Sequence, residues 1–166
     1  MTLEIIPLSL TFGKNSQDRM AEAKNPGKEG ALAAVETFYC AFNSRSPGLL
    51  KEVWLNDPLC QLNNPLGGMM RGIEPISALY EKIFNGPSRV WVEFYDIILY
   101  LTRDAAIFAG RERGEFVKGE AAVNLAIRTT RVFLYDSAAG RWAQAHHHGS
   151  IDDAALLDRY QKAVNP

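Results

Sequence analysis

The chain has 166 residues, of which 47% are hydrophobic, and this is enough for one ordinary domain with a full core. Its 18 Lys and Arg residues nearly balance 19 Asp and Glu residues, so no overall field favours nucleic acid or an anionic membrane. No apolar run approaches the roughly 20 residues that span a bilayer. Cys40 and Cys60 lack the spacing of a zinc or redox pair, so we expect buried free thiols and a cytoplasmic protein.

The first 28 residues divide into a short apolar piece and a polar run. Glu4 and Pro7 interrupt the apolar piece, unlike the uninterrupted core of a secretory leader. We therefore interpret residues 1–28 as a flexible or partner-dependent arm. A further hypothesis is that translation starts naturally at Met20, which the intact mass of the native protein would settle.

Three helices are expected in the first half of the chain. Leu32, Val35 and Phe38 belong to an apolar stripe with spacings of three and four, which is typical of a helix packed on a core. Ser46 followed by Pro47 predicts an N-cap and the first position of a second helix. The three predicted helices span residues 31–43, 46–54 and 73–84.

The second half of the chain has the texture of long strands joined by short polar turns, which predicts an antiparallel meander. The expected strands span residues 90–101, 105–117, 121–135 and 141–150, with a shorter one at 60–63. A final helix is expected at residues 152–164. This segregation predicts an α+β fold, with three N-terminal helices packed on one face of a curved antiparallel sheet. We accordingly divide the chain into an arm (1–28), a domain (29–150) and a C-terminal helical tail (151–166).

All three histidines lie together on the last strand. Strict alternation puts His147 on one face, and His146 and His148 with Gln144 on the other, although a β-bulge would reverse the parity. The pattern alone does not decide which face is inward. Only His146 and His148 could share a metal ion, and no third ligand lies nearby in sequence, so no metal site is expected.

Arg131 stands in an otherwise apolar strand, where its charge costs free energy unless it is paired or solvated. Two interpretations remain open. Arg131 could anchor an anionic ligand such as a carboxylate, or it could form a structural ion pair with Glu112 or Glu115 on the neighbouring strand. The charged run at residues 111–115 is otherwise most simply a solvated strand with cross-strand ion pairs.

Three segments carry a family resemblance. They are AVETFYCAFNSRSPGLLKEVW, QLNNPLGGMMRGIEPI and RVFLYDSAAGRWAQAHHHGS. In order and spacing they resemble the SnoaL-like branch of the NTF2-like, or cystatin-like, superfamily over residues 29–150. The last segment is especially similar to the association (hub) domain of calcium/calmodulin-dependent protein kinase II. The resemblance implies a cone-shaped α+β fold with a pocket at its open end and a dimer formed by the outer face of the sheet.

The resemblance also allows each catalytic position of ketosteroid isomerase to be compared. The isomerase's basic Asp before Pro matches Asn64, which has no carboxylate, and its oxyanion-donating Tyr matches Phe38. No Asp or Glu follows Glu120 in the strand that should hold the second acid. Ketosteroid isomerase activity is therefore not expected. The hub domain's pocket Arg falls on Arg131, and its concave face would hold His147.

The sequence thus predicts a protein that binds a small organic molecule and forms a homodimer or a higher homo-oligomer, without nucleic acid, membrane or cofactor. His147 would be the general acid or base of a lyase, isomerase or cyclase step, and Arg131 would anchor an acidic ligand. The other residues expected in the pocket are Phe38, Trp54, Asn64, Tyr80 and Tyr95. The alternative is a non-catalytic oligomerisation module, and fold kinship does not choose between them.

Overall fold

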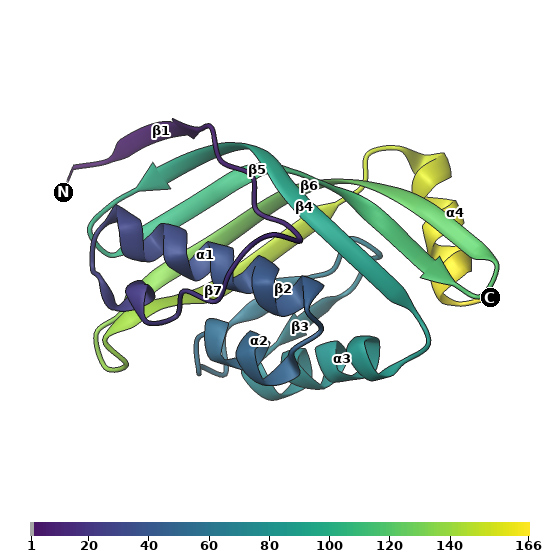
Figure 1. Ribbon diagram of the computed structural model, residues 1–166, viewed down its shortest axis with the longest axis horizontal. Coiled ribbons are helices and arrows are strands. Elements are labelled where there is room, and N and C mark those ends of the chain that lie inside the picture. Colours follow the sequence, from purple (N-terminus) through teal and green to yellow (C-terminus); the bar gives the residue numbers. More distant parts are fainter. Residues whose placement is uncertain (1) are drawn as a thin grey trace.

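The computed structural model describes residues 2–166 and contains one seven-stranded sheet in the order β1-β4-β5-β6-β7-β2-β3 (Figure 1). The strands are β1 (Glu4–Leu8), β2 (Gln61–Asn63), β3 (Met69–Arg71), β4 (Arg89–Leu101), β5 (Ala105–Lys118), β6 (Ala121–Asp136) and β7 (Arg141–Ser150). The helices are α1 (Lys28–Asn43), α2 (Pro47–Val53), α3 (Ile73–Asn85) and α4 (Ala154–Val164), with a short 3-10 turn at Glu22–Lys24. The helices and the long strands therefore lie where the sequence predicted them.

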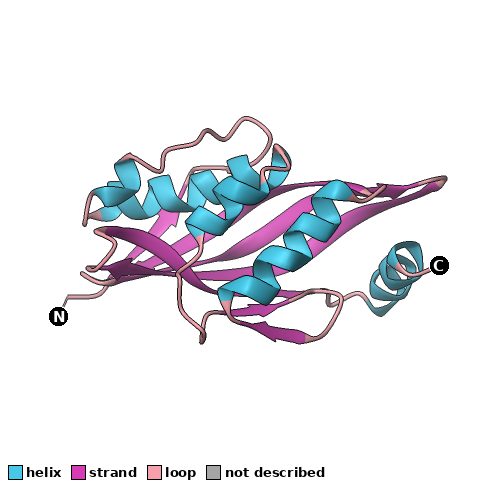
Figure 2. Cartoon of the chain, turned by 90° about the horizontal axis from the view of Figure 1, so that it is seen from below, coloured by secondary structure: helices cyan, strands magenta, loops and turns pink. Residues whose placement is uncertain are grey.

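Helices α1, α2 and α3 lie on one face of the sheet, and α4 lies at the end where β5 turns into β6 (Figure 2). The start of α2 is fixed as expected, because the Ser46 hydroxyl accepts a hydrogen bond from the Leu49 amide and Pro47 follows the cap. The α+β class is confirmed. One pairing departs from the antiparallel expectation, since β2 runs parallel to β7.

The sheet is strongly curved where β4 and β5 pair. The register between them shifts after Tyr95, and Asp96 adopts a positive φ of 53° at this bulge. On β5, a Cβ placed at Gly110 would lie 2.8 Å from the Asp96 carbonyl oxygen, and one at Gly114 would lie 1.9 Å from that of Trp91. Glycine at both positions therefore lets the two backbones approach closely, and the sheet can wrap around α1.

The N-terminal segment packs against the domain, although the sequence suggested a flexible arm. Strand β1 pairs with Ile97–Leu101 of β4, an element that the sequence analysis missed because Pro7 interrupts the pattern. Phe12 is buried and stacks on Tyr39 at 6.2 Å between ring centroids. The Trp142 indole N–H donates to the Asn25 carbonyl oxygen at 2.9 Å. Residues 4–25 thus contribute one edge of the sheet and part of the core.

Between residues 2 and 166, no helix is long and apolar enough to cross a membrane.

Candidate functional site

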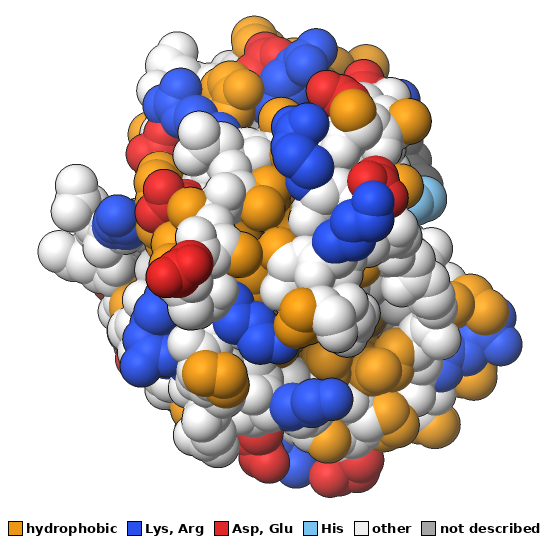
Figure 3. All heavy atoms as spheres, turned by 90° about the vertical axis from the view of Figure 1, so that its right-hand side faces the viewer, with side chains coloured by type: hydrophobic (Ala, Val, Ile, Leu, Met, Phe, Trp, Pro, Cys, Tyr) orange, Lys and Arg blue, Asp and Glu red, His pale blue; other side chains and the backbone are white. Residues whose placement is uncertain are grey.

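A cavity of about 610 Å³ lies between the concave face of the sheet and helices α1 and α3. Its wall is mostly apolar, and it opens at the end of the molecule where α3 finishes and α4 lies. Figure 3 views this end and shows hydrophobic side chains in a hollow with Lys and Arg side chains around it. The cone and pocket that the resemblance implied are therefore present, and the polar residues at the buried end define the candidate site.

Arg131 lies at that buried end, with 1% of its surface exposed. Its guanidinium makes three side-chain hydrogen bonds and stacks over the Phe38 ring at 3.6 Å from the ring centroid. The bonds run from Nε to the Tyr39 hydroxyl (2.9 Å), from Nη1 to Gln144 Oε1 (3.0 Å) and from Nη2 to Glu112 Oε1 (2.9 Å). Of the two interpretations of Arg131, the ion pair with Glu112 is formed.

Glu112 is equally buried and also accepts a hydrogen bond from the Tyr39 hydroxyl. Burial raises the pKa of Tyr39 well above its ordinary value, so the phenol keeps its proton and can donate to the carboxylate. The same oxygen accepts from Arg131, and the three side chains therefore form a closed network. Because the guanidinium and the carboxylate cancel, this network has no net charge.

Glu112 also corrects the expectation of a solvated charged run on β5. Alternation turns Arg111, Arg113 and Glu115 to the convex side and Glu112 to the cavity, so Glu112 alone departs from the prediction. Arg113 pairs with Glu93 and Arg111 with Asp96 on the convex face.

His147 faces Arg131 directly, because the two residues are paired across β6 and β7. It lines the cavity, is 5% exposed, and neither ring nitrogen has a hydrogen-bond partner among residues 2–166. Burial, reinforced by the charge of Arg131, lowers the pKa of His147 well below its ordinary value. The imidazole is therefore neutral near pH 7, with one nitrogen able to donate a hydrogen bond and the other able to accept one.

A bulge in β7 corrects the expected facing of its residues. Val132 pairs with His146 but Phe133 pairs with Gln144, so Ala145 is the extra residue. Gln144 consequently faces inward with His147 rather than outward with His146, and this lets it reach Arg131. His146 and His148 remain on the convex face, with ring centroids 6.4 Å apart.

Five of the seven residues predicted for the pocket line the cavity, namely Phe38, Asn64, Tyr80, Arg131 and His147. Trp54 does not, because its parallel bridge with Gln144 buries it in the core beyond the cavity. Tyr95 does not, because Phe94 takes the inward position of β4 and Tyr95 faces outward under Arg113. Tyr39, which lies on α1 beside Phe38, was not predicted, because no local pattern distinguishes it from a core residue.

The C-terminal helix also belongs to the cavity wall. Tyr160 lines the cavity and packs on Phe116 at 5.3 Å between ring centroids. The Lys118 ammonium group donates to the Val164 carbonyl oxygen at 2.9 Å, which holds the end of α4 against β5. The segment expected as a separate tail thus helps to close the pocket.

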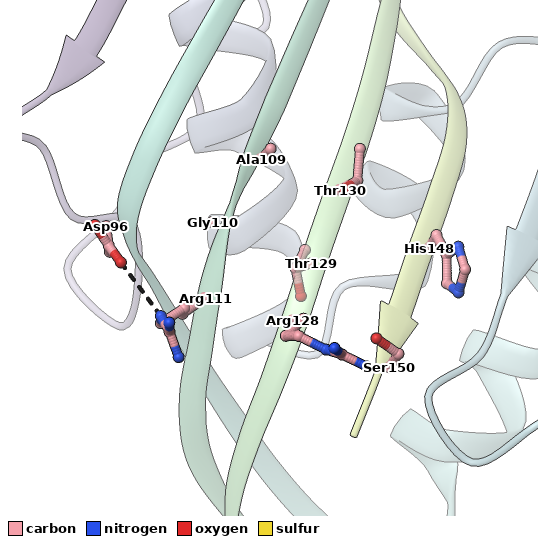
Figure 4. A pocket seen from close by; sticks show the side chains of 9 residues that line it. All are labelled: Asp96, Ala109, Gly110, Arg111, Arg128, Thr129, Thr130, His148 and Ser150. Carbon is pink, nitrogen blue, oxygen red and sulfur yellow. Dashed lines mark hydrogen bonds and ion pairs between the residues drawn. The ribbon is translucent and has the colours of Figure 1, made fainter. Parts of the chain in front are cut away.

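A second, shallow hollow lies on the convex face, where Arg128 extends toward Ser150 and Arg111 pairs with Asp96 at 3.2 Å (Figure 4). His148 stands at its edge. The side chains that could act here are exposed to water. Within residues 2–166 no group of three or more His, Cys, Asp or Glu side chains could hold a metal ion, on this face or in the cavity.

Comparison with family models matches residues 31–154 to the SnoaL-like domain. The chain belongs to the SnoaL-like family. Comparison with curated proteins gives no match.

Solved structures with the same fold are numerous. A protein of Thiobacillus denitrificans described as a calcium/calmodulin-dependent protein kinase type II association domain is 25% identical, with a TM-score of 0.56 over 72% of this chain and 92% of its own. A protein of Streptomyces avermitilis described as a dehydratase of the NTF2-like family is 19% identical, with a TM-score of 0.67 over 76% and 96%. A protein of Caulobacter vibrioides with a cystatin-like fold is 19% identical, with a TM-score of 0.62 over 82% and 98%. The NTF2-like resemblance is therefore confirmed.

Proposed function

We propose that this SnoaL-like protein binds a small, largely apolar organic molecule in the cone cavity, and that His147 hydrogen-bonds to it. The observation that carries the proposal is the buried imidazole of His147, which lines the cavity and whose two ring nitrogens have no hydrogen-bond partner among residues 2–166. An unsatisfied buried polar group costs about 1–3 kcal/mol, so such groups are normally matched by a ligand or by water. Phe38 and Tyr80 supply the apolar wall on which the ligand's body would lie.

In the catalytic version of this proposal, His147 is the general acid or base of a lyase, isomerase or cyclase step. A neutral imidazole can accept a proton at one nitrogen and polarise a carbonyl or hydroxyl group with the other. Support comes from the likeness to the Streptomyces protein described as a dehydratase. Asn64 has no carboxylate and Phe38 has no donor, so a ketosteroid-type reaction would lack its base and its oxyanion donor.

Arg131 was expected to anchor an acidic ligand, but its ion pair with Glu112 favours a different role. A ligand carboxylate would have to compete with Glu112 for the guanidinium, so we propose that Arg131 chiefly braces the buried end of the cavity. Its contact with Gln144 also fixes β7 beside His147. A cytoplasmic location stays part of this proposal, and the free thiols of Cys40 and Cys60 are compatible with it.

The test is a thermal-shift screen of the purified protein against small aromatic and aliphatic alcohols, ketones and acids. A compound present at about 100 times its Kd should stabilise the folded state by about 2.7 kcal/mol, or roughly 5–11 °C for a domain of this size. The His147→Phe variant should lose this shift, whereas His148→Phe, altered on the convex face, should keep it. A shift of equal size in wild type and His147→Phe would contradict the role of the imidazole. Hits are then assayed for turnover.

Assembly through the convex face is the second candidate function. One row of outward-facing apolar side chains crosses strands β4, β5 and β6, because Tyr100 pairs with Ile107 and Ile107 pairs with Val132. Such a row on a sheet face is a typical homodimer surface. The likeness to the Thiobacillus association domain supports the same idea. Gln144, which the sequence placed on this face, lies inside and is excluded from it.

Light scattering after size-exclusion chromatography tests the assembly. We expect a dimer or larger oligomer for wild type, and a smaller species for Ile107→Lys, since burying an unpaired ammonium group at the interface is costly. Lys162→Gln on α4 is the control and should leave the mass unchanged. A monomeric wild-type protein would remove this candidate function.

A further inference from the structure

The cavity wall carries more positive than negative charge. Its charged side chains are Lys82, Lys118, Arg131 and Glu112. Glu112 and Arg131 neutralise each other, and His147 is uncharged near pH 7. The excess positive charge therefore belongs to the two lysines.

The two lysines are at the rim of the cavity and not at its buried end. Lys82 is exposed in the last turn of α3, and Lys118 is half-buried at the end of β5. The ammonium group of Lys118 donates one of its three N–H groups to the Val164 carbonyl oxygen, which leaves two N–H groups for a ligand. Arg131 and His147, by contrast, are at most 5% exposed. The cavity is thus neutral at its buried end and cationic at its mouth.

We infer that the ligand is an amphipathic hydroxy or keto acid. Its hydroxyl or carbonyl group would lie against His147, its apolar body along the wall, and its carboxylate at the rim beside Lys82 and Lys118. This inference rests on the proposed function and reverses the orientation that Arg131 alone would have suggested.

Electrostatics favour this orientation. A carboxylate placed beside Arg131 would bring a second negative charge next to Glu112, in a site where neither could be hydrated. At the rim, the same carboxylate keeps part of its water and meets two cations. A neutral polar group suits the buried end, because His147 can donate and accept there. Both hydrogen bonds to Glu112 end on Oε1, so Oε2 can accept from a ligand hydroxyl.

Apolar side chains separate the two polar ends. Phe38 stacks on the Arg131 guanidinium and Ile127 pairs with Glu112, whereas Leu125 and Phe116 continue the wall along β6 and β5 toward Lys118. A ligand that reaches both ends therefore needs a hydrocarbon or aromatic body between its two polar groups.

Calorimetric titration with a matched set of probes tests this assignment. The probes are 12-hydroxydodecanoate, 1,12-dodecanediol and 12-amino-1-dodecanol, which share one body and differ in the charge of one end. Wild type is expected to bind the hydroxy acid roughly three- to tenfold more tightly than the diol, as two partly exposed ion pairs would give, and to bind the amino alcohol most weakly. The Lys82→Gln/Lys118→Gln variant should bind acid and diol alike.

A control variant, Lys51→Gln/Lys162→Gln, removes two exposed lysines elsewhere and should keep the preference. The preference of wild type should also shrink between about 20 mM and about 500 mM sodium chloride, because charges at a solvated rim are screened. A preference that survives the rim substitutions, or that salt does not change, would place the carboxylate at the buried end and overturn the inference. Equal binding of all three probes would overturn it and leave the proposed function intact. Binding of none, together with an empty thermal-shift screen, would count against both.

Discussion

Removing the charge of Glu112 tests whether the buried network holds the site together. Glu112→Gln keeps the shape of the side chain but leaves the Arg131 guanidinium, 1% exposed, without a counter-charge. Breaking a buried pair by removing one partner typically costs about 3–5 kcal/mol, because the remaining charge stays desolvated. In a domain of this size each kcal/mol lowers Tm by about 2–4 °C, so we expect a fall of about 6–20 °C.

The assay is unfolding by urea and by heat at pH 7, with circular dichroism as the signal that monitors the folded fraction. Glu115→Gln is the matched control on the same strand, since Glu115 faces the convex side and should change stability by less than about 0.5 kcal/mol. The double variant Glu112→Leu/Arg131→Met removes both charges and should be more stable than Glu112→Gln alone. If Glu112→Gln costs no more than the control, the ion pair does not stabilise the fold and our account of Arg131 is wrong.

Three further outcomes follow from the packing and from the buried histidine. The unfolded chain protonates His147 near its ordinary pKa of about 6.5 but the folded state does not, so stability should fall below that pH by up to about 1.4 kcal/mol per unit. Urea titrations at pH 7 and pH 5 should show this slope in wild type and His148→Gln, and a flatter one in His147→Gln. Phe12→Ala should cost about 3–5 kcal/mol, measured by the same unfolding, if the N-terminal segment belongs to the core. Gly114→Ala should cost about 1–3 kcal/mol or more, because its Cβ would overlap the Trp91 carbonyl oxygen, and an unchanged Tm would show that β4 can move away.

Local pattern was enough for the helices and the long strands. The apolar stripe around Val35 and the cap at Ser46 act over a few residues, so their effect can be read without knowing the fold. Strand β1 was not predicted, because Pro7 is unusual in a strand. A proline is nevertheless tolerated at the edge of a sheet, which is where β1 lies. Strand β3 was not predicted, because three residues are too few to show an alternation of apolar and polar side chains.

The site was harder to predict, because its contacts join distant parts of the chain. Tyr39 and Arg131 are 92 residues apart, and the sequence around either residue does not indicate their contact. The family resemblance supplied Arg131 and the inward facing of His147, whereas alternation alone left the facing undecided. Neither supplied Glu112 as the partner in preference to Glu115, since that choice depends on which side of β5 faces the cavity.

The bulge at Ala145 explains how β7 can place both Gln144 and His147 on the concave face. In a regular strand, Gln144 and His147 lie on opposite faces, and only one of them could reach the cavity side of the sheet. The extra residue puts both on the concave face, so Gln144 can bind the Arg131 guanidinium while His147 keeps both nitrogens free. Each nitrogen of the Arg131 guanidinium thus donates one hydrogen bond, to Tyr39, Gln144 or Glu112, and none of these bonds uses the imidazole. The bulge therefore permits one strand to contribute both a brace for the buried charge and an unpaired hydrogen-bonding group for a ligand.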